Sequence, residues 1–251
     1  MPSRVIINAD DFGLATDNNQ VIVAAFRQGL ISSATLMANT PAFVEACELF
    51  HAEGLHGRVG LHVNLTHGRP LTQSIAAHRA FCSSAGEFDL NLSRQSVSLS
   101  RNVRDAIRQE ILAQWQRCLD HGVRPSHVDS HQHVHNLWPV GEELARFAAQ
   151  QKVPLRPARN LGANISLPKR FFKGLLNRHL RRLAGQTADF ACTPHDLITS
   201  NMPVLGTLEV IAHPTQLAEG FGDEYLAAGV RLDELLERRL ANVQRIAYSE
   251  L

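Results

Sequence analysis

The chain has 251 residues, of which 44% are hydrophobic and 20% are charged, values typical of a globular protein and not of a disordered or fibrous one. Lysine and arginine total 25 against 24 aspartate and glutamate, so the balance of charge gives no reason to expect nucleic acid as a partner. The N-terminus has no basic segment followed by a long apolar run, and no stretch approaches the roughly 18 apolar residues of a membrane span. We therefore expect a cytoplasmic protein without stable membrane insertion.

Hydrophobic patterns predict strands and helices in alternation along the whole chain. The predicted strands cover residues 4–9, 33–39, 58–65, 126–131, 154–159 and 207–214, and the predicted helices cover 18–30, 41–54, 99–121, 139–151, 169–183 and 230–247. Residues 66–97, rich in Gly, Pro, Ser and Thr, predict a long irregular loop, a feature that is usually functional in a compact domain. Such alternation indicates an α/β fold with a parallel sheet, open or closed into a barrel, in a single domain over residues 1–251.

The predicted helix at 169–183, KRFFKGLLNRHLRRL, is basic and amphipathic. The simpler interpretation is a helix with a solvated charged face. The alternative is a surface for an anionic or lipid-linked substrate.

Polar residues gather at the carboxyl ends of the predicted strands, the edge at which parallel α/β folds build their active sites. They are Asp10, Asp11, His62, Asn64, Asp129, His131, Arg156 and His213. The chain has no Walker-type glycine loop, no strand-linked dinucleotide fingerprint and no G-x-S-x-G elbow. Nucleotide-dependent chemistry and serine hydrolysis are therefore not indicated.

Asp10 and Asp11 follow the first predicted strand. Because side chains alternate across a strand, we expect the two carboxylates to point in different directions, so that one can bind a metal while the other faces substrate. An Asp-Asp pair at a strand end can instead cap a turn or the next helix.

Residues 126–135, SHVDSHQHVH, hold four histidines and one aspartate. An aspartate with two histidines suits a divalent first-row metal and leaves positions open for water and substrate. Four imidazoles cannot all bind one ion, so some are expected to support the ligands. His62 is alternatively a satisfied core residue, His213 a turn residue before proline, and Arg156 a surface charge unless it faces the site.

Four motifs together resemble the YdjC-like carbohydrate deacetylases: NADDFGLA, GLHVNLTHGRPL, HVDSHQHVH and EVIAHP, within residues 4–215. The resemblance implies a distorted (β/α) barrel related in architecture to the NodB-type polysaccharide deacetylases. It also implies an enzyme that removes acetyl groups from N-acetylated sugars such as chitooligosaccharides, and a homodimer. The loop at 66–97 varies within the family and is expected to shape the sugar site.

The same resemblance implies that Asp11, His62 and His131 bind a divalent metal ion, either Mg²⁺ or Zn²⁺. The family often has a further histidine where this chain has Gln132. That departure leaves the ligand positions unchanged.

By the same resemblance Asp10 is the general base, His213 is the general acid, and Arg156 orders the base. A histidine acid must stay protonated at the working pH, so a neighbouring carboxylate would help it. Asp129 and Glu209 are the candidates for that partner.

Two rival functions use similar residues. One is a metal-dependent phosphoesterase or another amidohydrolase, although two-metal phosphatases usually recruit more carboxylates than the pattern brings together. The other is a sugar-binding protein without catalysis, which would need neither a base nor an acid.

Overall fold

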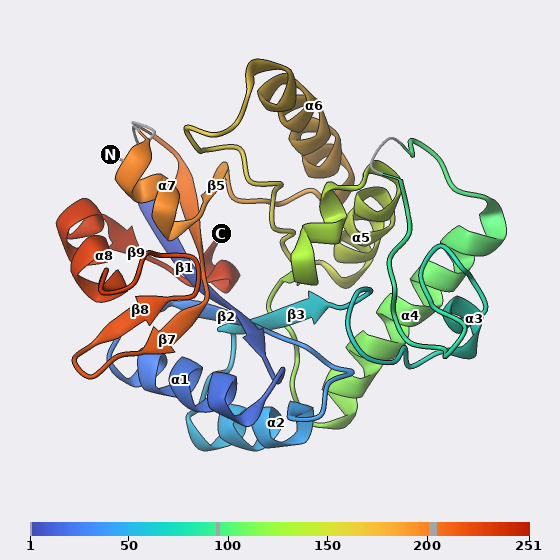
Figure 1. The fold of residues 1–251 in the computed structure, drawn as a ribbon, viewed down its shortest axis with the longest axis horizontal. Helices are drawn as coiled ribbons and strands as arrows, with labels where there is room; N and C mark the ends of the chain where they lie inside the picture. Colours follow the sequence, from blue (N-terminus) through green and yellow to red (C-terminus); the bar gives the residue numbers. More distant parts are fainter. Residues whose placement is uncertain (1, 94–95, 201–204) are drawn as a thin grey trace.

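A parallel sheet forms the centre of the computed structural model, which describes residues 2–93, 96–200 and 205–251 (Figure 1). Its strand order is β4–β3–β2–β1–β6–β5. The strands are β1 (Arg4–Phe12), β2 (Ser33–Leu36), β3 (Val59–Val63), β4 (Val128–Ser130), β5 (Phe190–Cys192) and β6 (Thr207–Ala212). Strand β1 is central, because it pairs with both β2 and β6, and it is buried from Val5 onward. A central parallel strand is covered on both faces, which explains why Val5, Ile6 and Ile7 are consecutive apolar residues.

The segment around Leu155 connects the two ends of this sheet. Leu155 forms single parallel bridges with Val128 of β4 and with Thr187, which precedes β5. The strand predicted at 154–159 is thus reduced to one bridging residue, because Pro154 and Pro157 on either side cannot donate to a strand ladder. The result is a distorted (β/α) barrel, and the predicted fold class is confirmed.

Helices surround the sheet, with α1 packed on α2 and α5 packed on α6 (Figure 1). They are α1 (Thr16–Arg27), α2 (Phe43–Ala52), α3 (Gln73–Ala76), α4 (Arg101–Asp120), α5 (Trp138–Gln151), α6 (Leu167–Ala184), α7 (Pro194–Thr199) and α8 (Leu232–Leu240). The five helices predicted between residues 18 and 183 begin and end within three residues of α1, α2, α4, α5 and α6. Within the described ranges, no helix combines the length and apolar character needed to cross a membrane.

The C-terminal end of the chain differs from its prediction, because the helix expected at 230–247 ends at Leu240. The chain then forms β9 (Gln244–Arg245), which pairs with the start of β1, and the short 3-10 helix η2 (Tyr248–Glu250). Tyr248 is fully buried in a small apolar cluster with Ile6. Burial of this tyrosine beside β1 outweighs the local preference for a longer helix.

Several short elements have no counterpart in the prediction. They are β5, α7 and the hairpin formed by β7 (Pro214–Gln216) and β8 (Phe221–Asp223). The predicted loop at 66–97 contains the single-turn helix α3 and an isolated bridge between Cys82 and Phe88. Residues 94 and 95 of this loop lie outside the described residues.

Candidate active site

Arg156 is fully buried among carboxylates that come from three strands. Its Nη1 and Nη2 donate to Asp10 Oδ2 and Oδ1 at 2.7 and 2.6 Å, and its Nε donates to Glu209 Oε1 at 2.7 Å. Nη1 also lies 2.7 Å from Asp129 Oδ2. Burial opposes the charge, but these carboxylates raise the pKa of Arg156 well above its usual value. One guanidinium therefore links β1, β4 and β6 and fixes them relative to one another.

Asp10 is held in a single orientation. Besides its bidentate contact with Arg156, its Oδ1 accepts a hydrogen bond from Asn8 Nδ2 at 2.9 Å, since residues two apart on β1 share a face. Burial alone would raise the pKa of Asp10, but Arg156 and His62 outweigh burial and hold it well below its usual value. Asp10 is thus an ionised carboxylate whose Oδ2 lies 4.0 Å from both His62 Nε2 and His213 Nε2.

Asp11 faces the same site as Asp10, contrary to the prediction that the two carboxylates diverge. The pairing of β1 with β2 shifts register between Ala9 and Phe12, and Asp11 has a φ of 68°. This left-handed backbone, which aspartate tolerates better than most residues, breaks the alternation of the strand. Asp11 Oδ1 consequently lies 3.3 Å from His62 Nε2 and 3.9 Å from His131 Nε2.

His62, on β3, is oriented by Asp129 from the neighbouring strand. Asp129 Oδ1 lies 2.6 Å from His62 Nδ1, and Thr35 Oγ1 donates to Asp129 Oδ2 at 3.1 Å. Burial disfavours a charged imidazole, but Asp129 and Asp10 raise the pKa of His62 to about 10. The carboxylates thus favour positive charge at this imidazole, whose Nε2 faces Asp11.

His131 completes the group from the segment after β4. Thr66 Oγ1 lies 2.6 Å from His131 Nδ1 and so fixes the ring. Burial, followed by His62, lowers the pKa of His131 to about 4, which leaves a neutral imidazole at neutral pH. Gln132 and His133 have φ values of 49° and 54°, so the chain leaves the strand direction directly after His131.

His213 follows β6 and is placed by the β7–β8 hairpin. Its backbone N–H donates to Asp223 Oδ2 at 2.7 Å, and its ring packs edge-on against Tyr225. His213 Nε2 lies 3.8 Å from Asp11 Oδ2. Neither candidate carboxylate partner of this histidine fills that role, because Asp129 pairs with His62 and Arg156, and Glu209 pairs with Arg156 and Tyr248.

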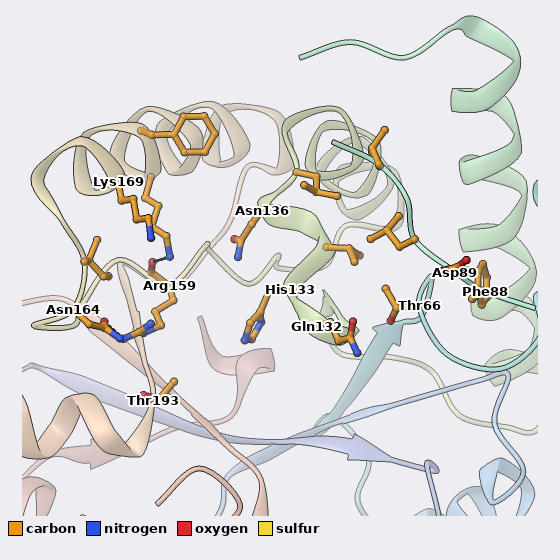
Figure 2. Close-up of a pocket in the computed structure, with 17 residues that line it drawn as sticks. Thr66, Phe88, Asp89, Gln132, His133, Asn136, Arg159, Asn164, Lys169 and Thr193 are labelled. Atoms are coloured by element: carbon orange, nitrogen blue, oxygen red, sulfur yellow. Dashed lines mark hydrogen bonds between the residues drawn. The ribbon is translucent and has the colours of Figure 1, made fainter. Parts of the chain in front are cut away.

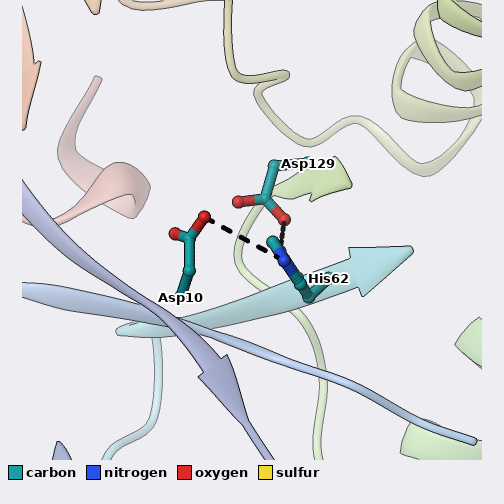
Figure 3. A group of neighbouring side chains, drawn as sticks. All are labelled: Asp10, His62 and Asp129. Atoms are coloured by element: carbon teal, nitrogen blue, oxygen red, sulfur yellow. Dashed lines mark hydrogen bonds and ion pairs between the residues drawn. The ribbon is translucent and has the colours of Figure 1, made fainter. Parts of the chain in front are cut away.

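Two overlapping sets of side chains here could hold a cation. Asp10, His62 and Asp129 have donor atoms within 4.8 Å of one another (Figure 3). However, Arg156 already contacts both oxygens of Asp10 and one of Asp129, and His62 contacts the other. Asp11 Oδ1, in contrast, is buried without a hydrogen-bond partner among the described residues. It faces two imidazole nitrogens, so the donor set around Asp11 fits a divalent cation better.

The other histidines of the 126–135 segment have separate roles. His127 is buried and stacks on Tyr248 at a ring distance of 3.8 Å, and His135 is buried against Ser130 Oγ at 2.6 Å. His133 lines a cavity beside the site.

Sequence reasoning missed four residues that support the site: Asn8, Thr35, Thr66 and Tyr248. Asn8 carried a usable signal, because it lies two positions before Asp10 on a strand. Tyr248 carried none, since its hydroxyl donates to Glu209, a residue distant in sequence.

The family model described as YdjC-like protein matches residues 4–236 of the chain. The chain belongs to the YdjC family. It is 36% identical over 208 residues to a carbohydrate deacetylase of Geobacillus stearothermophilus, covering 77% of this chain and 80% of the relative. It is also 32% identical over 218 residues to a carbohydrate deacetylase of Clostridium beijerinckii, covering 85% of this chain and 82% of the relative.

Two further proteins are similar to this chain, one in sequence and one in structure. A chitooligosaccharide deacetylase of Yersinia enterocolitica is 38% identical over 162 residues, which cover 62% of this chain and 60% of that protein. The crystal structure of an Enterococcus faecalis protein proposed to cleave cellobiose phosphate superposes with a TM-score of 0.68 and 22% identity, covering 100% of this chain and 99% of that chain. The structural likeness supports the fold alone.

Proposed function

We propose that this YdjC-family protein is a metal-dependent hydrolase that removes the acetyl group from an N-acetylated sugar. The observation that carries the proposal is the convergence of Asp11 Oδ1 with His62 Nε2 at 3.3 Å and His131 Nε2 at 3.9 Å, beside the Asp10–Arg156 pair. The names of the deacetylase relatives support the same reaction and a carbohydrate substrate.

Asp11, His62 and His131 are the proposed ligands of a divalent ion, Mg²⁺ or Zn²⁺. When bound, such an ion polarises the acetyl carbonyl and lowers the pKa of a water molecule. Asp129 at His62 Nδ1 and Thr66 at His131 Nδ1 leave the Nε2 atom of each ring directed toward Asp11. Partners of this kind fix the orientation of a ligating imidazole.

Asp10 is the proposed general base. It is ionised, and Arg156 fixes its carboxylate plane so that Oδ2 remains directed toward the two histidines. A small cavity of about 40 Å³ is lined by both Asp10 and His213, which is enough volume for a water molecule. Asp10 would accept a proton from that water as its oxygen adds to the acetyl carbon.

His213 is the proposed general acid. Its side chain is 16% exposed and its Nε2 lies within 4.0 Å of both aspartates, on the side of the site reached from the small cavity. As the carbon–nitrogen bond breaks, His213 would protonate the departing sugar nitrogen, and acetate would leave. Asp10 and His213 thus divide the two proton transfers that amide hydrolysis requires.

The rival phosphoesterase is less well supported by the charge arrangement. Asp10, Asp129 and Glu209 all bind Arg156, so Asp11 is the site carboxylate, among the residues that the structure describes, that faces imidazole nitrogens alone. A two-metal phosphatase bridges its ions with several carboxylates. This arrangement favours a single ion.

The proposal is tested by measuring acetate released from N-acetylglucosamine oligomers together with the metal content of each variant. His62→Ala and His131→Ala should lose both bound metal and activity. Asp10→Asn should retain the metal and lose turnover by about a hundredfold or more, because it removes the base and keeps the ligands. His213→Ala should likewise retain the metal.

Four results would count against the assignments. Full metal content in both histidine variants would remove them from the ligand set, and a near-normal rate in His213→Ala would exclude it as the acid. Acetate release that is insensitive to a chelator would contradict metal dependence. Phosphate release from a generic ester, without acetate release from any acetylated sugar, would favour the phosphoesterase. The homodimer and the cytoplasmic location stay predictions.

A further inference from the structure

Two routes of contact connect Tyr248 to Asp10, the proposed general base. Tyr248 and Glu209, its hydrogen-bond partner, are both fully buried. Neither is among the described residues that line the cavity of about 900 Å³ beside His133 (Figure 2) or the small cavity at Asp10. Tyr248 is therefore out of reach of a substrate bound in either cavity, and any effect on turnover must pass through other residues.

The first route begins at the Tyr248 hydroxyl. It donates a hydrogen bond to Glu209 Oε2, and Glu209 Oε1 accepts from Arg156 Nε at 2.7 Å. The two remaining nitrogens of that guanidinium hold both oxygens of Asp10. In the described part of the chain, no other donor bonds to Glu209 Oε2. Removal of the hydroxyl would thus leave a buried carboxylate oxygen without a donor.

The second route begins at the face of the Tyr248 ring. It stacks on His127, with ring centroids 3.8 Å apart and planes inclined by 12°. His127 Nε2 lies 3.2 Å from Asn8 Oδ1, and Asn8 Nδ2 donates to Asp10 Oδ1 at 2.9 Å. Because Asn8 donates through its amide nitrogen, its oxygen is left to accept from the His127 ring. The tyrosine ring thus packs against the residue that orients Asn8.

We propose that Tyr248 is a positioning residue for the deacetylation reaction, and that its hydroxyl keeps Glu209 ionised and bonded to Arg156. The inference rests on the proposed function and adds a residue to its machinery. An ionised carboxylate forms a charge-assisted bond to a guanidinium, which is about twice as strong as a bond between neutral groups. A protonated Glu209 would hold Arg156 less strongly, and the guanidinium would then shift out of the plane of Asp10. The proposed base would lose its fixed orientation.

The surroundings of Glu209 bring its ionisation close to neutral pH. The ionisable groups that interact with it come from other segments of the fold: Arg156, Tyr248, Asp129, Asp10 and Cys192. Burial raises the pKa of Glu209 to about 7, and Arg156 and the Tyr248 hydroxyl oppose this rise. Loss of the hydroxyl should therefore raise the pKa of Glu209 further and favour its protonated form at neutral pH.

Tyr248→Phe tests the hydroxyl, because it removes the oxygen and keeps the ring that stacks on His127. A hydrogen bond to an ionised group is worth a factor of about ten or more, so kcat for acetate release at neutral pH should fall about tenfold. KM and metal content should stay near the wild-type values. Ile246→Val is the matched control, because it shortens an apolar side chain in the same buried cluster and removes no polar contact, so its kcat should equal that of wild type.

The pH profile separates positioning from a simple loss of stability. Because the proposal requires an ionised Glu209, a higher pKa of this carboxyl shifts the acidic limb of the kcat profile to higher pH, and raising the pH restores the ionised form. The ratio of kcat in Tyr248→Phe to kcat in wild type should therefore rise about fivefold between about pH 7 and pH 9. The ratio cancels the titration of His213, which both proteins share. A ratio that stays low and constant with pH would overturn the proposal.

Glu209→Gln mimics the protonated form and tests whether the hydroxyl acts through Glu209. This variant should have a low kcat across the pH range. Tyr248→Phe added to it should lower kcat by less than about twofold, because two residues of one network are not additive. A further loss of about tenfold in the double variant would contradict the route through Glu209.

Two measurements separate the role of Tyr248 from the deacetylase function. Acetate release by wild type, with an unchanged kcat in Tyr248→Phe, would contradict the role of the tyrosine alone. If no acetylated sugar is hydrolysed, carbon-13 NMR of glutamate-labelled protein still follows the ionisation of Glu209, and Glu209→Gln identifies its carboxyl signal. A higher pKa of Glu209 in Tyr248→Phe than in wild type would support the proposal, and an equal pKa would overturn it.

Discussion

Asp10 and Asp11 are adjacent and chemically identical, yet their carboxylates contact different groups. Asp10 has both oxygens engaged by Arg156 and a further bond from Asn8, whereas Asp11 faces the imidazoles of three histidines, His62, His131 and His213. Environments that differ in this way commonly separate the roles of paired carboxylates. The saturated carboxylate suits a positioned base, and the open one suits a ligand.

Arg156→Lys should separate positioning from metal binding. Lysine keeps the charge but lacks the planar fork, so it cannot hold Asp10 at both oxygens and also reach Asp129 and Glu209. We expect kcat to fall by about a hundredfold while the metal content stays near that of the wild type, because Arg156 contacts none of the proposed ligands.

The control for this variant is Arg27→Lys, whose guanidinium pairs with Glu53 at the exposed surface. It should retain full activity. A kcat of wild-type magnitude in Arg156→Lys would show that the fixed carboxylate plane of Asp10 does not matter to turnover.

At the scale of elements, regular periodicity was readable from the sequence and special backbone geometry was not. The apolar runs of β1 and β3 and the amphipathic helices α4 to α6 follow their patterns, which placed the polar strand ends on one edge. The direction of Asp11 could not be read, because it depends on a register shift and a positive φ that aspartate permits but does not require. Contacts such as that between Tyr248 and Glu209 depend on tertiary packing, and the local sequence pattern does not predict them.

Gly60, in strand β3, lies against the His127 ring, which leaves no room for a side chain at this position. A Cβ added at Gly60 would lie 2.5 Å from His127 Nδ1, and that ring is held by stacking on Tyr248 and by a contact with Asn8. Gly60→Ala should therefore lower the free energy of unfolding by about 1–3 kcal/mol, as overpacking does in a filled core.

Gly174→Ala in α6 is the matched control for Gly60→Ala, since an added Cβ there meets nothing within 4 Å. Helix propensity should make this variant more stable by roughly 0.5–1 kcal/mol. Urea unfolding of both variants measures the two changes. Equal stability of Gly60→Ala and wild type would mean that His127 can move aside.

At the scale of the whole molecule, the proposed ligands come from segments far apart in the chain. Asp11 lies near the end of β1, His62 belongs to β3 and His131 follows β4. Asp129 and Thr66 hold the two imidazole rings in place. An unfolded chain cannot present this set, so an ion that binds here binds the native state alone and adds its binding free energy to folding. The same contacts that assemble the site would thus make the fold sensitive to a bound ion.

Metal removal should therefore lower Tm as well as activity. At an ion concentration of about 100 times Kd, linkage stabilises the native state by about 2.7 kcal/mol. For a chain of this size each kcal/mol shifts Tm by about 2–4 °C, so we expect the metal-loaded protein to melt about 5–10 °C above the chelator-treated one. His62→Ala should melt at one temperature in both conditions, because it lacks a ligand, whereas Asp10→Asn should keep the shift. An equal shift in His62→Ala and wild type would place the ion elsewhere, because stabilisation by linkage requires that the variant still bind it.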